Sequence, residues 1–261
     1  MRALLASPLG FLIGLSLGAL GGGGSILAVP ALVYAAGQDP KAATTTSLVL
    51  VTFTALIGII PHWRAGRVRF GAGAVFGLAG IGGSLLGSAW NEAVDPDVLL
   101  LAFSALMLVA AYAMWRRLNS PNDAQAPPDG AADVRFDAAT AVKVLVAGSF
   151  VGLLTGFFGV GGGFVIVPAL VLALGFTMPE AVGTSLLVIA VNSMVALTTR
   201  LPGGSIEWAT VIPFTIASLI GVFVGSRLAS TRDPSFLQKW FIGFLVVIAV
   251  YTAGSSIVAL A

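Results

Sequence analysis

The sequence predicts an all-α integral membrane protein made of two homologous halves, and its composition is the first reason. Of its 261 residues, 57% are hydrophobic and 9% are charged, and the mean hydropathy is +1.01. Soluble domains carry roughly 25% charged residues, so a soluble fold of this length would lack the charges to cover its surface. Because the bilayer interior offers the backbone no hydrogen bonds, every span is expected to be a helix.

Charge-free stretches mark the expected spans, since about 20 apolar residues are needed to cross about 30 Å of hydrocarbon. Two stretches, 3–38 and 144–179, are too long for one span, and glycines interrupt them at 21–24 and 161–163. We expect each to be a broken helix with a long first arm and a short second arm, which brings the total to about eight hydrophobic units. The simple spans are expected at 42–61, 70–90, 98–115, 181–199, 208–226 and 240–261.

An internal repeat is the second reason. Residues 14–48 align without a gap to residues 152–186, and 17 of these 35 positions are identical. The constant offset, which pairs Pro30 with Pro168, divides the chain into a first transmembrane repeat, 1–115, and a second, 144–261. The polar segment 116–143 between them is predicted to be a flexible cytoplasmic linker. Duplicated halves with matching interrupted helices are typical of secondary transporters, whose site lies where the halves meet.

The distribution of Lys and Arg bears on topology. If each broken helix crosses the membrane fully, the halves are parallel, and nine Lys and Arg residues face one side and four the other. If each turns back at its glycines, the halves are inverted and the division is ten against three. Cytoplasmic loops carry the excess of positive charge, so the inverted arrangement with external termini is favoured.

The two glycine-rich turns are predicted to bind an anion. Each opens a new short helix, and a helix N-terminus carries unpaired N–H groups and a partial positive charge. A kink or a close helix crossing is the alternative interpretation. The residues concerned are Gly22, Gly23, Gly24 and Ser25 in the first turn and Gly161, Gly162 and Gly163 in the second.

Polar side chains near these turns are candidates for further substrate contacts, because hydroxyls and amides can donate to an oxyanion. The alternatives are hydroxyls that bond back to their own helix and an amide that joins two helices. The hydroxyl candidates open the helices after the broken ones, and the amide lies two turns deeper; they are Thr46, Ser47, Thr184, Ser185 and Asn192.

Other residues are interpreted structurally. Small residues four apart let helix backbones approach closely, and they recur at Gly10, Gly14 and Gly18 and at Gly148, Gly152 and Gly156. His62, beside Trp63, is expected at the membrane interface, and Thr177 is expected to cap a helix. The arginines at 64, 67 and 69 are read as topology determinants.

Several classes of function are disfavoured by what the sequence lacks. It has no cysteine and one histidine, and no acidic or basic residue lies in the middle of an expected span. We therefore expect no metal site, no proton relay and no cofactor. Without Walker, HExxH or GxSxG motifs we expect no catalytic residue and no enzyme, and the small net charge of +2 gives no reason to expect nucleic acid as a partner.

The motif GxGGG-xxx-VPAL, present at 159–170 and degenerately at 21–32, resembles the TauE/SafE family of sulfite-exporter-like permeases. The GTS at 183–185 and the TTS at 45–47 resemble it too, so the similarity covers both halves. It implies an inner-membrane permease for small anions such as sulfite or organosulfonates. The first copy departs from the motif at Ser25, where the second has Gly163, and this difference is expected to tune one half of the site.

We therefore expect a secondary transporter, a permease or exporter, that moves small anions across the cytoplasmic membrane. Its expected partners are the anionic substrate and the lipid bilayer, and a homodimer is a possible assembly. An anion channel and a membrane scaffold that transports nothing remain the alternatives.

Overall fold

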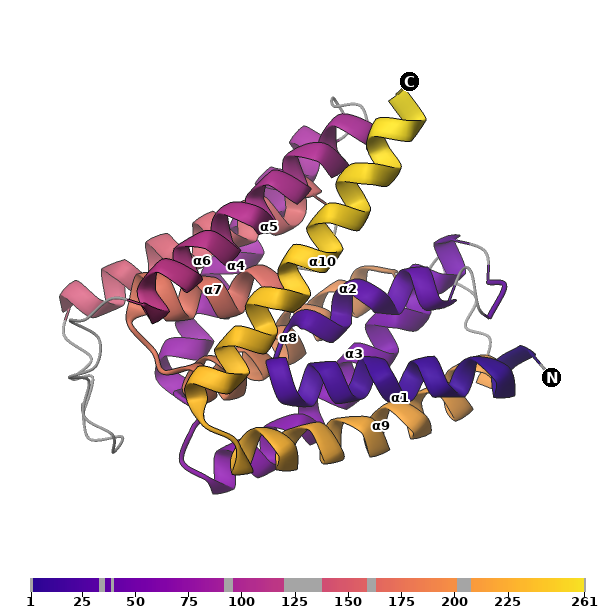
Figure 1. Cartoon of the computed structure of the whole chain (residues 1–261), viewed down its shortest axis with the longest axis horizontal. Helices are drawn as coiled ribbons and strands as arrows, with labels where there is room; N and C mark the ends of the chain where they lie inside the picture. Colours follow the sequence, from indigo (N-terminus) through magenta and orange to yellow (C-terminus); the bar gives the residue numbers. More distant parts are fainter. Residues whose placement is uncertain are drawn as a thin grey trace.

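The computed structural model describes residues 2–32, 36–38, 40–91, 96–119, 138–158, 163–200 and 208–260. These residues form ten helices and no strand, as the composition predicted (Figure 1). The helices are α1 (Arg2–Leu20), α2 (Gly23–Pro30), α3 (Pro40–Arg64), α4 (Phe70–Asn91), α5 (Pro96–Leu118), α6 (Ala138–Phe158), α7 (Gly163–Leu174), α8 (Met178–Arg200), α9 (Trp208–Thr231) and α10 (Pro234–Leu260).

Six of these helices are long and apolar enough to cross a membrane, and each overlaps one of the predicted simple spans. The qualifying segments are Thr45–Arg64, Phe70–Gly87, Leu101–Leu118, Met178–Thr198, Val211–Thr231 and Pro234–Gly254. α5 and α6 also extend into the predicted linker 116–143, whose residues 120–137 lie outside the described part of the chain. The chain is therefore a multi-pass membrane protein.

The first long stretch is broken where the sequence places its glycines. α1 ends at Leu20, Gly21 adopts a left-handed φ of +74°, and α2 begins at Gly23. α2 then folds back along α1. This is shown by Gly24, on which an added Cβ would lie 2.3 Å from the carbonyl oxygen of Ile13. In a continuous helix those two residues would stand about 16 Å apart along the axis. Figure 1 shows the two indigo helices forming this hairpin.

Close glycine-mediated crossings join the two parts of the chain. α1 packs along α9, and α4 packs along α6. A Cβ on Gly14 would lie 1.9 Å from the Ser218 carbonyl oxygen, and one on Gly152 would lie 2.1 Å from that of Gly80. The repeat aligns Gly14 with Gly152 and Gly80 with Ser218, so the two crossings use corresponding positions. The predicted packing role of these glycines is confirmed.

Helices α3 and α8 form the centre of the bundle and contact each other. They contain the two spans with the largest buried share, 67% and 56% of their residues. Gly58 of α3 faces Leu186 of α8, and His62, one turn further along α3, faces Gly183, which is earlier in α8. The two helices therefore run antiparallel, and α8 begins at the end of the molecule where α3 ends.

Gly14→Ala is expected to destabilise the protein by about 1–3 kcal/mol, because its methyl group would overlap backbone atoms that cannot rotate away. Gly82→Ala in α4 is the matched control, since a Cβ there meets nothing within 4 Å. Thermal unfolding of both variants in detergent measures the difference. Equal melting temperatures would contradict the α1–α9 crossing.

Candidate functional site

The N-termini of α2 and α7 meet inside the helical bundle, backbone against backbone. Gly22 is the N-cap of α2, and a Cβ placed on it would lie 1.4 Å from the Gly163 carbonyl oxygen and 2.5 Å from the Phe164 nitrogen. Gly163 is the first residue of α7, so the N-termini of two short helices adjoin at this contact. Both N-termini carry partial positive charge.

The predicted turn residues divide between this junction and its surroundings. Gly22, Ser25 and Gly163 lie at the contact between the turns. Gly23 is the first residue of α2, and Gly24 instead faces α1. The remaining predicted turn residues, Gly161 and Gly162, lie outside the described part of the chain.

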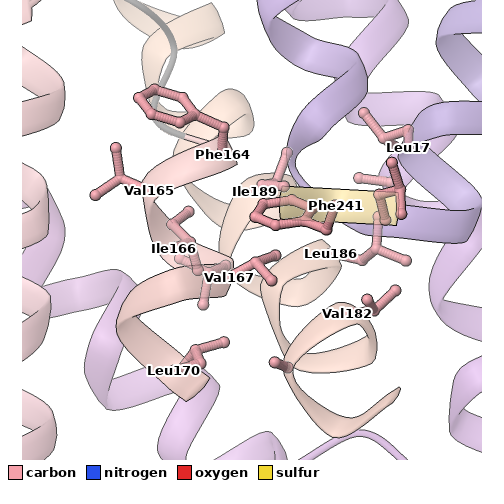
Figure 2. Close-up of a cluster of buried hydrophobic side chains, with 14 of the residues drawn as sticks. Leu17, Phe164, Val165, Ile166, Val167, Leu170, Val182, Leu186, Ile189 and Phe241 are labelled. Atoms are coloured by element: carbon pink, nitrogen blue, oxygen red, sulfur yellow. The ribbon is translucent and has the colours of Figure 1, made fainter. Parts of the chain in front are cut away.

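Ser185 is the predicted hydroxyl that packs against the first turn. A Cβ on Gly21 would lie 2.5 Å from the Ser185 Oγ and 2.9 Å from a methyl carbon of Val167. The Ser185 hydroxyl donates to the Val182 carbonyl at 2.8 Å, as the bond-back alternative describes. Figure 2 shows the neighbouring apolar side chains, with Val167 of α7 across from Val182 and Leu186 of α8.

The threonine one residue earlier points elsewhere. Thr184 faces the start of α4, where the Arg69 backbone N–H donates to its Oγ1 at 3.1 Å and its methyl group packs near Gly73. Its counterpart Thr46 on α3 is fully buried, and its Oγ1 has no partner among the described residues. Thr184 is fully buried too. The hydroxyls of Thr46 and Thr184 donate to no described backbone carbonyl. In this they differ from Ser185, whose hydroxyl donates to Val182. Ser47, next to Thr46, is also buried in α3.

Asn192 lies between α8 and α4, deeper along the bundle. Its side chain faces Gly77 and Gly80, whose added Cβ atoms would lie 3.8 Å from Oδ1 and 3.7 Å from Nδ2. Oδ1 is buried and has no hydrogen-bond partner among the described residues. Seven residues separate Asn192 from Ser185, which places the two side chains on nearly the same face of α8.

An ion pair that was not predicted from the sequence joins the start of α8 to the residue before α4. Arg69 donates to Glu180 Oε1 from NH2 at 2.6 Å and from Nε at 3.1 Å. Glu180 Oε2 accepts the backbone N–H and the hydroxyl of Thr177, at 3.0 and 2.9 Å. The Thr-x-x-Glu capping-box spacing was a visible signal for the second contact. Thr177 precedes α8 as predicted, but its hydroxyl donates to Glu180 Oε2, which is not the accepting role expected of a capping side chain. No local pattern indicates Arg69, which lies 111 residues away.

The interface prediction for His62 is wrong. Its side chain is 1% exposed, and its Nε2 lies 3.3 Å from the Gly18 carbonyl oxygen near the end of α1. The last carbonyls of a helix have no partner within it, so a polar side chain is stabilised there. Gly183 makes room for it, because a Cβ at that position would lie 3.0 Å from the His62 Cβ.

Comparison with known proteins identifies the group to which these features belong. The sequence matches the family described as Sulfite exporter TauE/SafE over residues 6–252. The chain belongs to the TauE/SafE family. The resemblance found in the glycine-rich motifs is thus confirmed, and TauE/SafE proteins form a membrane transporter family, which is not an enzyme class.

Relatives of this TauE/SafE chain extend over nearly its whole length. A probable membrane transporter protein of Xylella fastidiosa (strain 9a5c) is 33% identical, covering 93% of this chain and 91% of its own. The probable membrane transporter protein YunE of Bacillus subtilis is 24% identical over 95% of this chain and 92% of its own. YfcA of Escherichia coli, another probable membrane transporter protein, is 26% identical over 90% of this chain and 82% of its own. No solved structure matches the chain.

The Arg69–Glu180 pair is expected to contribute measurable coupling to stability. Removing one partner leaves the other charged and partly buried, so Arg69→Gln and Glu180→Gln each lower the unfolding free energy. The double variant costs less than the sum of the two, by about 0.5–3 kcal/mol. Denaturant unfolding of the four proteins in detergent measures this coupling. Strict additivity would show that the contact contributes nothing.

Proposed function

We propose that this TauE/SafE protein is a secondary transporter that carries small anions, such as sulfite or an organosulfonate, across the cytoplasmic membrane. The single observation that supports it most is the junction of Gly22 and Gly163, where two helix N-termini adjoin backbone against backbone, with the Ser25 hydroxyl beside them. Each terminus presents about half a positive charge and several N–H donors in a medium of low dielectric constant. Backbone N–H groups are the donors that this junction offers to an anion.

A site without a free cationic side chain binds an anion weakly and reversibly. A transporter needs such binding, because it has to release its substrate. The guanidinium of Arg69 is neutralised by Glu180 and holds no free charge for the anion. The buried hydroxyls of Thr46 and Thr184 keep their protons available, and the amide of Asn192 supplies polar atoms deeper in the bundle. A substrate can therefore be stabilised in steps without a lysine or arginine that would retain it.

No coupling carboxylate is needed for export. An anion leaving a negative interior gains about 2.3 kcal/mol per charge for each 100 mV of membrane potential. The spans hold no acidic residue at mid-depth, which is consistent with a uniporter or a weakly coupled exporter. The same energetics opposes uncoupled uptake, so efflux is the proposed direction.

We further infer that the two halves are inverted repeats. The first residues of α3 and α8, of α4 and α9, and of α5 and α10 are aligned with each other in the repeat. Corresponding glycines make corresponding crossings, and α8 begins at the end of the molecule where α3 finishes. These contacts support halves of opposite orientation, with the arginine-rich segment 64–69 in the cytoplasm.

Gly22→Ala is expected to abolish anion flux, because its Cβ would occupy the place of the Gly163 carbonyl oxygen. The measurement is efflux of sulfite, sulfate, thiosulfate, sulfoacetate and taurine from proteoliposomes, with Gly82→Ala as the matched control. Gel filtration verifies that each variant remains folded and dispersed. A folded Gly22→Ala protein that transports like the wild type would refute the site, and a wild type that carries none of these solutes would refute the function.

Single cysteines test the inverted topology, and the cysteine-free chain needs no background removal. Ala65 follows α3 and Arg232 follows α9, and both are exposed. In inverted halves, Ala65→Cys and Arg232→Cys react with an impermeant maleimide from the same, cytoplasmic side. In parallel halves they react from opposite sides. Labelling of intact cells and of inverted vesicles separates the two results.

A further inference from the structure

His62 is a buried base, and one of its two ring nitrogens has no partner. Its side chain is 1% exposed, and its Nε2 lies 3.3 Å from the Gly18 carbonyl oxygen. Because a carbonyl oxygen only accepts hydrogen bonds, Nε2 carries the proton of the neutral ring. Nδ1 is therefore the basic atom, and it is buried without a hydrogen-bond partner among the described residues. A further proton can be taken up only at this atom of the ring.

The segment between α3 and α4, residues 65–69, packs over this histidine together with the start of α8; we call it the connector. The Arg67 backbone N–H donates to the His62 carbonyl oxygen at 2.9 Å. A Cβ on Gly183 would lie 2.9 Å from the Arg67 carbonyl oxygen and 3.0 Å from the His62 Cβ. Arg69 adds contacts from its backbone N–H and its guanidinium to α8. The connector thus holds α8 against His62.

Among the described residues, the elements packed around the ring bring it no free carboxylate. The end of α1 that adjoins the ring carries no charge. The end of α3 brings Arg64, the connector brings Arg67, and α9, which packs against α1 and α3, brings Arg227. α8 brings Glu180, whose carboxylate is already held by Arg69 at 2.6 Å. A proton on the ring would therefore place an unpaired positive charge in a buried site, which is costly.

We propose that His62 Nδ1 is a proton-binding site and that its protonation releases the connector from the start of α8. The neutral ring fits the closed packing, whereas the charged ring is solvated only after the connector moves and water reaches it. Acid therefore favours the released form. Histidine is the side chain whose charge changes between pH 5 and 8, and this chain has one histidine and no cysteine. The proposal does not depend on which solute the protein transports.

Labelling of a cysteine in the connector measures its release. Val68 is 8% exposed, and Ala65 in the same connector is exposed. The rate at which a maleimide labels Val68→Cys in detergent is divided by the rate for Ala65→Cys, which corrects for the pH dependence of thiol reactivity. Between pH 7.5 and 5.5 we expect this ratio to rise about tenfold, because a hydrated histidine takes up most of a proton over that range and the packed one takes up none.

His62→Gln is the matched control, since the Gln amide can donate to the Gly18 carbonyl oxygen but takes up no proton. In that background the ratio should not change with pH. A constant ratio in the protein that keeps His62 would overturn the proposal, and so would an equal rise in the His62→Gln protein. The first comparison needs no substitution at position 62, so it decides the question even where His62→Gln fails to fold.

Discussion

The contact between Gly22 and Gly163 constrains the rest of the molecule. A Cβ on Gly22 would stand 1.4 Å from the Gly163 carbonyl oxygen, so the two backbones meet only where side chains are missing. For this contact to form, α1 must end at Leu20 and α2 must reverse along it. The backbone carbonyls at the end of α1 lose their partners within the helix and need others inside the membrane. Side chains from other helices supply them, as His62 does for Gly18.

Features that depend on composition and spacing were accessible from the sequence. The bilayer imposes a length and an apolar character on each span, so the six long helices followed from charge-free stretches. The repeat offset paired Gly14 with Gly152, and both lie at close crossings as small residues four apart indicate. The break between α1 and α2 was recognisable at 21–24 because glycine runs seldom occur in a helix without a packing or turning role.

Features that depend on helix rotation and long-range contacts were not accessible. Thr184 and Ser185 are adjacent in the sequence, yet one faces α4 and the other the first glycine turn, and only the packing of α8 decides which. His62 looked like an interface residue because it closes a span next to Trp63. Its burial follows from the free carbonyl of Gly18, which belongs to a helix 44 residues earlier.

The ion pair of Arg69 and Glu180 has no equivalent in the repeat. The alignment places Glu207 opposite Arg69 and Ala42 opposite Glu180, and those two residues cannot form such a pair. Any movement that separates α8 from the segment before α4 has to part a guanidinium from a carboxylate, and the aligned residues of the other half impose no such cost. The pair at the start of α8 therefore joins α8 to the segment before α4 with a charged contact that the aligned residues of the other half lack.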